Sequence, residues 1–575
     1  MNGEHPPYRE FTAASLLVSL VIGVAMCAAF TYSGLMLGFT LAGSTIGAIL
    51  GFAFLRPFGR GRGSILEVNQ VQTGASAVNV ASAGAVFTIP ALFLMGYAGE
   101  FSILAAVLAA TSGTLLGLAV ISPLRKQMIE MERLRFPSGL AVASILKTPG
   151  ESLDKALLLG AGLLISAVFK ICVDWHGLAE GNAVLLPERI DLGPLLGLGP
   201  YTSVVFSLSL MNVAAGMLAG RGGLPFAFGA VLAWWILAPG AHFAGWTAGH
   251  EGAAETRFLY SEMLRPLGIG VLVGGALMGV LLTWPAIKAA FDSLKRAGVS
   301  GGGRDEAPAS FIVTGAFLSL ALLFLAGWLG ADLPLGPALL TAVVGGLWLA
   351  LAGIIVAQAT GMTDISPISG MALIACTLML LILGDEAVVP TIFIGAAVCV
   401  GASQCADMMQ DLKTGHLVGA RPWKQQLTQL LLTWIGPAVA VGTIYILWTA
   451  GEGGRGGFGP GTKLPAPQAD ALKAVVEGLV KGDVPWDKYA LGTLLGGMVS
   501  LLPFAGIGVL VGLAMYLPAE ITLSYGIGCL ISIALGRIRG RAFLARRLVP
   551  FAAGLILGEA LTALTLSLYQ IAGRG

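Results

Sequence analysis

The sequence predicts an all-α polytopic membrane protein, and three observations support this prediction: its composition, its repeated apolar runs and the grouping of its basic residues. Hydrophobic residues make up 56% of the 575 residues and charged residues only 11%, whereas a soluble domain is roughly 25% charged. Apolar runs near the length that crosses about 30 Å of hydrocarbon recur along the whole chain. The formal net charge of +2 leaves no basic face for nucleic acid.

Counting these runs gives about sixteen expected transmembrane helices, some of them broken or re-entrant. The first run is followed at once by a second and shows no small-residue cleavage site, so we interpret it as a span and not as a signal peptide. The expected spans are 11–31, 34–54, 77–96, 101–121, 156–174, 201–219, 224–243, 264–287, 310–330, 335–357, 361–383, 387–404, 426–449, 490–516, 519–536 and 548–571.

Basic clusters set the expected orientation, because loops rich in Lys and Arg stay on the cytoplasmic side. Four clusters, around Arg60, Arg133, Lys295 and Arg421, can all lie inside together with the N-terminus. The loops 175–200, 244–263 and 451–489 then face outward. The cluster Arg537–Arg547 breaks this scheme if 490–516 is one span, so we expect two segments around Pro503 and Gly506, or a re-entrant element.

The sequence also predicts short helical elements in two further segments. Residues 136–147 are too few to span a bilayer and predict a hairpin or a surface helix. In the loop 451–489, a glycine-rich stretch precedes a short amphipathic helix at 471–481, which would be either a lid over an entrance or a plain surface helix. We treat 1–575 as a single membrane domain, with duplicated halves at 1–309 and 310–575 as a hypothesis.

The segment from Ile65 to Gly96 is the most informative, because it places carboxylate, amide and hydroxyl groups among small residues within an apolar region. In lipid such groups must be paired within the protein or face a watery cavity. At 3.6 residues per turn, Gln72, Ser76 and Asn79 share one helical face, which Asn69 and Glu67 continue. A second polar segment, GMTDISPISGM from Gly361, is broken by Pro367 and by glycines.

Five motifs in order along the chain resemble the signature segments of the oligopeptide transporter (OPT) family, which includes the Yellow Stripe-like metal-chelate transporters. They are EVNQVQTGASA from Glu67, LRFPSGLAVASILK from Leu134, DISPISGM from Asp364, DLKTGHLVGARPWKQQ from Asp411 and GLAMYLP from Gly512. Ser138 and Arg421-Pro422-Trp423 depart from the commoner family pattern.

The resemblance implies a proton-coupled symporter that imports small oligopeptides, including glutathione-like ones. An importer of metal chelates is the alternative within the family, and a membrane-embedded enzyme or passive channel is the alternative from another class. We expect no enzymatic activity, no cofactor and no metal site, since the six cysteines and five histidines are dispersed. The expected location is a bacterial inner membrane with a cytoplasmic N-terminus. Expected partners are a small peptide or peptide-like chelate, protons and lipid, but no nucleic acid, and either a monomer or a homodimer is compatible with the sequence.

Candidate site residues follow from the polar segments and, for Tyr516, from the family-like YLP motif. A proton-coupling group must be a carboxylate that loads and releases a proton near the pathway. The proton-coupling candidates are Glu67, Asp364, Asp407 and Asp411. Each of these carboxylates could instead be an interfacial or ion-paired group without a transport role. The substrate-binding candidates are Asn69, Gln72, Thr73, Ser76, Asn79, Ser366, Ser369, Gln404, Gln410 and Tyr516.

Overall fold

The computed structural model is built from helices, with one small β-hairpin among the residues that it describes. These residues are 9–39, 43–55, 64–147, 152–174, 185–247, 249–282, 284–285, 288–289, 308–364, 366–451, 456–481, 485–504 and 506–574. The hairpin pairs β1 (Arg189–Asp191) with β2 (Val205–Ser207) in antiparallel register, with Ile190 opposite Phe206. The all-α class predicted from the sequence is confirmed.

Twelve described helices are long and apolar enough to cross a membrane, fewer than the sixteen expected, and four shorter apolar helices accompany them. The expected spans 201–219 and 224–243 form one continuous helical run, Leu210–Phe243. Expected spans 34–54, 361–383 and 490–516 contain shorter helices, because the chain breaks within or beside each of them. Gly38, Asp364 and Gly506 at these breaks have positive φ angles, a backbone conformation that ends a right-handed helix.

The division of 490–516 into two segments is confirmed, with α20 (Trp486–Val499) and α21 (Ile507–Tyr516) on either side of the break. The short helix expected at 136–147 is also present, as α5 (Pro137–Leu146). The amphipathic helix expected at 471–481 is α19 (Pro467–Lys481), and its first turns are buried instead of lying on the surface. An ion pair joins this part of α19 to α11 (Arg265–Leu282): Asp470 is 2% exposed, and its Oδ2 lies 2.8 Å from Nη2 of Arg265.

By its contacts the chain divides into two compact units that do not coincide with the halves 1–309 and 310–575. Unit 1 comprises Met1–Thr31, Thr40–Ala156 and Thr283–Tyr445, and unit 2 comprises Tyr32–Phe39, Leu157–Leu282 and Ile446–Gly575. Each unit therefore combines segments from both halves of the sequence.

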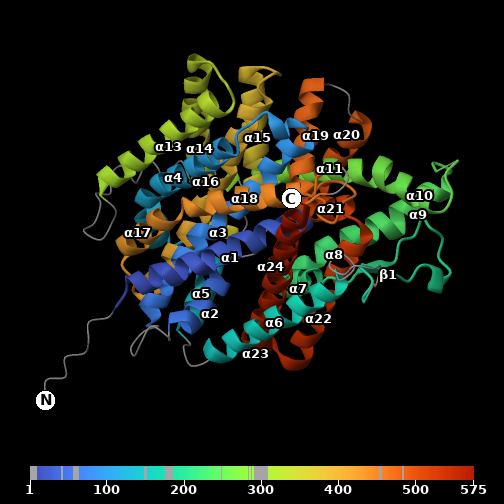
Figure 1. Ribbon diagram of the computed structural model, residues 1–575, viewed down its shortest axis with the longest axis horizontal. Coiled ribbons are helices and arrows are strands. Elements are labelled where there is room, and N and C mark those ends of the chain that lie inside the picture. Colours follow the sequence, from blue (N-terminus) through green and yellow to red (C-terminus); the bar gives the residue numbers. More distant parts are fainter. Residues whose placement is uncertain are drawn as a thin grey trace. The chain divides into compact units, whose positions relative to one another are not determined.

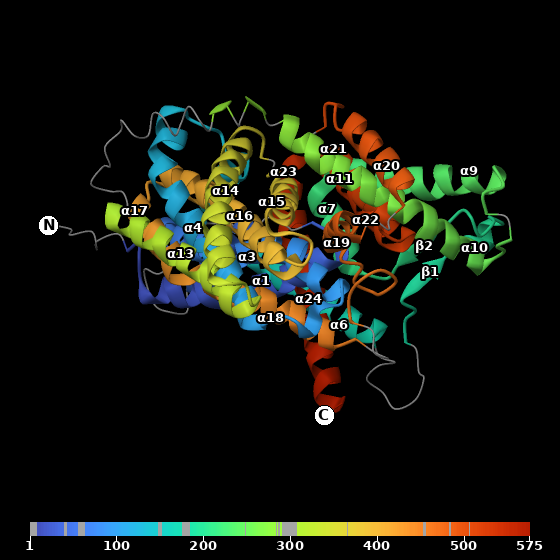
Figure 2. The same ribbon diagram turned by 90° about the horizontal axis from the view of Figure 1, so that it is seen from above.

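Unit 1 is organised around α16 (Val388–Val418), the candidate span whose most apolar part is entirely buried. This helix packs against α3 (Ile65–Leu94), α4 (Ile103–Ile121) and α14 (Leu335–Thr363), and Figures 1 and 2 both show α16 among them. The other helices of this unit are α1 (Ala13–Leu37, whose last residues belong to unit 2), α2 (Ser44–Leu55), α13 (Ala309–Gly330), α15 (Ile368–Leu383), α17 (Pro422–Leu432) and the first part of α18 (Ile435–Thr449).

Unit 2 is built on two groups of packed helices. In one, α11 (Arg265–Leu282) packs against α20 and α21, and in the other α7 (Leu210–Ala219) packs against α22 (Ala519–Arg539) and α24 (Val549–Arg574). An apolar cluster that includes Trp234, Leu259 and Met515 forms the core around α11 and α21. The remaining helices are α6 (Ser152–Val173, which begins in unit 1), α8 (Leu224–Val231), α9 (Ala238–Phe243), α10 (Ala253–Phe258) and α23 (Arg541–Phe543).

Candidate functional site

The polar face of α3 lies inside unit 1. Its candidate residues are almost fully buried, with exposed fractions of at most 5% for Glu67, Asn69, Gln72, Thr73, Ser76 and Asn79. A helix that carries so many polar groups can be buried because neighbouring helices supply hydrogen-bonding partners for them. The main partners of this face are α16, α17 and the beginning of α2.

Asp411 of α16 is the centre of this arrangement and is 1% exposed. Three neutral donors from three other helices reach its carboxylate. Gln72 Nε2 of α3 and Ser44 Oγ of α2 donate to Oδ1, the latter at 3.2 Å, and Gln429 Nε2 of α17 donates to Oδ2 at 3.2 Å. In the part of the chain that the structure describes, no lysine or arginine forms a salt bridge with Asp411.

A second set of hydrogen bonds extends the network on both sides of Asp411. Gln425 Nε2 donates to Thr73 Oγ1 and to the backbone oxygen of Asp411, both at 2.9 Å. Gln404 Nε2 donates to Gln429 Oε1 at 2.7 Å, and Ser44 Oγ lies 3.3 Å from Ser76 Oγ, from which it can accept a hydrogen bond. The sequence candidates Gln72, Thr73, Ser76, Gln404 and Asp411 therefore belong to one network.

Sequence reasoning missed three members of this network: Ser44, Gln425 and Gln429. A signal for the two glutamines was present, because PWKQQLTQLLL places Gln425, Thr428 and Gln429 on one face of α17, and all three are buried. Nothing comparable marks Ser44, a lone hydroxyl at the beginning of α2.

The network lies at a defined depth along two antiparallel helices. Gln72 is seven residues from the beginning of α3, and Asp411 is seven residues from the end of α16. At 1.5 Å per residue, both lie about 10 Å inside their helix ends. Closer to the other end, Gly84 of α3 packs on the backbone of Val400.

Three amide side chains on α3 carry buried atoms without a hydrogen-bonding partner among the described residues. They are Asn69, through both Oδ1 and Nδ2, Gln70, through Nε2, and Gln72, through Oε1. Buried polar atoms in folded proteins are usually hydrogen-bonded, so unpartnered ones merit a functional explanation. The side-chain Oδ1 of Asn79, also on this face, lies 3.4 Å from Ser82 Oγ, which makes its shorter hydrogen bond of 2.8 Å to the backbone oxygen of Asn79.

A second group of candidates surrounds the break between α14 and α15. Asp364 is exposed and has a φ of 66°, and its carboxylate accepts hydrogen bonds from Ser138 N at 3.1 Å and from Ser138 Oγ at 2.8 Å. Gln410 Nε2 lies 3.5 Å from the same carboxylate, and the half-buried Asp407 is under its electrostatic influence. Asp364 thus caps the first turn of α5 from another helix.

Of the remaining candidates, Ser366 and Ser369 belong to the same break between α14 and α15, and Glu67 and Tyr516 lie elsewhere. Glu67, in the first turn of α3, accepts a hydrogen bond of 2.8 Å from Thr12 Oγ1. Ser366 Oγ lies 2.6 Å from Thr360 Oγ1, and Ser369 is half-buried in the first turn of α15. Tyr516 belongs to unit 2, where its hydroxyl donates to the backbone oxygen of Pro465 at 3.1 Å and its ring lies 5.9 Å from the Arg265 guanidinium.

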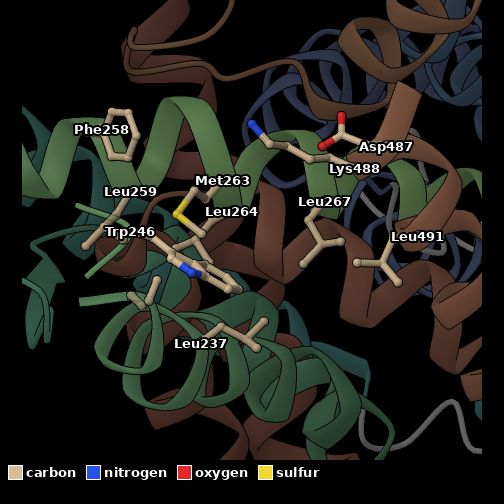
Figure 3. Close-up of a pocket in the computed structure, with 12 residues that line it drawn as sticks. Leu237, Trp246, Phe258, Leu259, Met263, Leu264, Leu267, Asp487, Lys488 and Leu491 are labelled. Carbon is tan, nitrogen blue, oxygen red and sulfur yellow. The ribbon is translucent and has the colours of Figure 1, made fainter. Parts of the chain in front are cut away.

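Three cavities lie elsewhere in the described structure, and neither Gln72, Ser76 nor Asp364 lines any of them. One of about 370 Å³ in unit 1 lies between α4 and α13. One of about 420 Å³ in unit 2 is mostly apolar, and Figure 3 shows Trp246 beside Met263 and Leu264, with Asp487 and Lys488 at one edge. The largest, of about 800 Å³, is in unit 2 and is lined by charged residues. The members of the Asp411 network are themselves buried, with exposed fractions of at most 2% for Gln72, Ser76, Gln404 and Asp411.

Twelve candidate spans and a buried network of amides around one carboxylate define the class of the protein, a multi-pass membrane protein of the transporter type. The chain belongs to the OPT oligopeptide transporter family, whose model matches residues 10–570. This finding confirms the resemblance inferred from the five sequence motifs.

Individual relatives come from both branches that the motifs suggested. The chain is 29% identical to a Haemophilus influenzae protein named as an oligopeptide transporter, over 93% of this chain and 92% of the relative. It is 25% identical to an Arabidopsis thaliana protein named as a metal-nicotianamine transporter, over 67% of this chain and 61% of the relative. A Saccharomyces cerevisiae protein named as an oligopeptide transporter is 37% identical over 16% of this chain and 13% of its own length.

Proposed function

We propose that this protein is a proton-coupled symporter that imports small oligopeptides and that Asp411 is its proton-coupling group. The observation that carries the proposal is the environment of Asp411, a carboxylate that is 1% exposed and bound by neutral donors on the central helix of unit 1. Asp411 combines this burial with a hydrogen bond from the substrate-binding candidate Gln72.

The physical reason lies in the cost of burying an unpaired charge. An ionised carboxylate away from water is costly unless a cation or several donors compensate it. Here the compensation comes from the amides of Gln72 and Gln429 and the hydroxyl of Ser44. When Asp411 takes up a proton, the group loses its charge and gains a donor of its own, so these donors bind it less strongly and become more available to cargo.

The groups available to cargo are those of a peptide-binding surface. Amide side chains offer a donor and an acceptor each, which matches the backbone of a peptide. The unpartnered atoms of Asn69 and Gln72 are therefore suited to peptide amides, whatever side chains the peptide carries. The Haemophilus influenzae relative, whose similarity covers 93% of this chain, is named as an oligopeptide transporter, and this name also favours peptides as cargo.

Import of metal chelates is a second candidate, favoured by the similarity over 67% of this chain to a protein named as a metal-nicotianamine transporter. In that case the metal would arrive already wrapped in its chelator, as cargo. For the location, we propose a bacterial inner membrane with a cytoplasmic N-terminus, on the basis of the basic clusters and the bacterial relative.

Uptake into proteoliposomes tests the function and separates the alternatives. With an imposed proton gradient, radiolabelled trialanine should accumulate inside above its external concentration, and a protonophore should abolish that accumulation. Nickel-nicotianamine, offered in parallel, should not accumulate if peptides are the cargo. Equilibration that ignores the protonophore would point to a passive channel, and release of free alanine would point to a membrane-embedded enzyme.

A further inference from the structure

The largest cavity of unit 2 carries charge of both signs on its walls. It has a volume of about 800 Å³, which falls within the range of roughly 300 to 1,000 Å³ typical of small-molecule sites. Lys170 on α6 and Asp174 just after it line one side, Glu188 lies just before β1, and Lys463 lies just before α19. All of these residues belong to unit 2.

The four charged side chains form a continuous series of ion pairs. Lys463 Nζ lies 2.5 Å from Glu188 Oε1 and 3.7 Å from Asp174 Oδ1. Asp174 Oδ2 lies 3.0 Å from Lys170 Nζ. Side-chain exposure falls along the series, from 61% at Lys463 to 21% at Asp174 and 12% at Lys170. The series therefore leads from solvent into the interior of the unit.

Helix stability does not account for this arrangement. Asp174 follows the last residue of α6, where the negative end of the helix dipole disfavours a carboxylate. A lysine four residues before an acid is also the less favourable order for a pair on a helix. The positions of Lys170 and Asp174 therefore do not stabilise α6. This observation favours a binding role for the two charges.

The rest of the cavity wall suits a peptide backbone. Gly451, Gly456, Gly457 and Gly461 line it, and because glycine has no side chain a ligand can come close to the main chain at these points. Tyr32, which is 7% exposed, also lines the cavity and its hydroxyl can both donate and accept a hydrogen bond.

We infer that this cavity binds the two charged ends of a short peptide, with Lys170 and Lys463 receiving the α-carboxylate and Asp174 and Glu188 receiving the α-ammonium group. A zwitterion can replace each ion pair that it breaks, because it brings one charge of each sign. The inference rests on the proposed function, since it takes peptides to be the cargo, and it assigns to unit 2 a second peptide site, distinct from the polar face of α3 in unit 1.

Calorimetric titration of the full-length protein in nanodiscs tests the inference with three probes: trialanine, its C-terminal amide and its N-acetyl derivative. Removing one charged end should weaken binding about tenfold or more, since charge-assisted hydrogen bonds are the stronger ones and about 1.4 kcal/mol corresponds to a factor of ten. Lys463→Gln should weaken trialanine binding and leave binding of the amide unaffected, so that the protein distinguishes the two less than wild type does, with Lys170 retaining part of the preference.

Lys473→Gln is the matched control, because Lys473 pairs with Glu477 within α19 and does not line the cavity. A second variant, Glu188→Gln, should remove the discrimination between trialanine and its N-acetyl derivative. Equal affinity of wild type for all three probes, or equal weakening of all three by Lys463→Gln, would overturn the inference.

Binding in nanodiscs needs no proton gradient, so the two proposals can fail separately. If trialanine and its capped forms bind alike while proton-driven uptake of trialanine persists, the cavity assignment is wrong and the proposed function stands. If the capped forms are rejected but uptake ignores the gradient, the cavity assignment stands and proton coupling is wrong.

Discussion

At the scale of single residues, the two carboxylates Asp364 and Asp411 have different environments although both lie in unit 1. Asp411 is buried and its carboxylate is bound by three other helices, whereas Asp364 is exposed and binds mainly the first turn of α5. Glu559 of unit 2 is buried, but like Asp364 it binds the beginning of another helix. It accepts hydrogen bonds from Met211 N at 2.8 Å and Ser209 Oγ at 2.6 Å at the beginning of α7. Capping by a distant carboxylate is thus used in both units.

A pair of substitutions at Asp364 distinguishes capping from proton coupling. Asparagine caps helices about as well as aspartate and tolerates a positive φ, so Asp364→Asn should keep wild-type stability and proton-driven uptake. Asp364→Ala loses the cap and should destabilise the protein by about 1 kcal/mol. Thermal unfolding in detergent and uptake assays measure both effects. If Asp364→Asn abolished gradient dependence in a stable protein, Asp364 would be the coupling residue.

At the scale of helices, close backbone contacts hold α16 in place. Gly113 of α4 lies so close to α16 that a Cβ atom added to it would be 2.3 Å from the backbone oxygen of Ala397. Gly401 of α16 in turn packs on the backbone oxygen of Gly113. Small residues allow such approaches between helices in lipid, where dispersion contacts and not water exclusion drive association. The position of Asp411 therefore depends on contacts several turns away along α16.

A matched pair of glycine substitutions tests this packing. Gly113→Ala forces the two helices apart and should destabilise the folded protein by about 1–3 kcal/mol. Gly160→Ala, in α6, meets no atom within 4 Å and should be neutral or stabilising by up to about 1 kcal/mol. Thermal unfolding of the two variants measures the difference. Equal stability of both variants would contradict the close contact between α4 and α16.

At the scale of the whole molecule, the sequence predicted the class, the family and one wall of the candidate site. The polar face of α3 was predictable because its residues recur with helical spacing within an apolar region. The partner of this face on α16 was less predictable, because Gln72 and Asp411 are 339 positions apart and no spacing rule links them. Ser44 shows the limit most clearly, because a lone serine gives no sequence signal until the fold brings it to Asp411.

The charged cavity of unit 2 was missed for a similar reason. Lys170, Glu188 and Lys463 come from segments that look unrelated in the sequence, and each could be an ordinary charge at a helix end or in a loop. The described residues contain twelve helices of spanning length and four shorter apolar ones, and the count of sixteen spans stays a prediction, because apolar length alone does not distinguish a full span from short helices separated by a glycine or a positive φ angle.

One comparison tests the central claim most directly: gradient-driven accumulation and gradient-free exchange of trialanine by Asp411→Asn in proteoliposomes. Asparagine keeps the shape of the side chain but cannot carry the proton. Exchange of labelled for unlabelled trialanine needs no net proton movement. The account predicts that Asp411→Asn keeps exchange and loses accumulation, while Asp385→Asn, at an exposed aspartate just before α16, keeps both. Accumulation by Asp411→Asn at the wild-type level would contradict it.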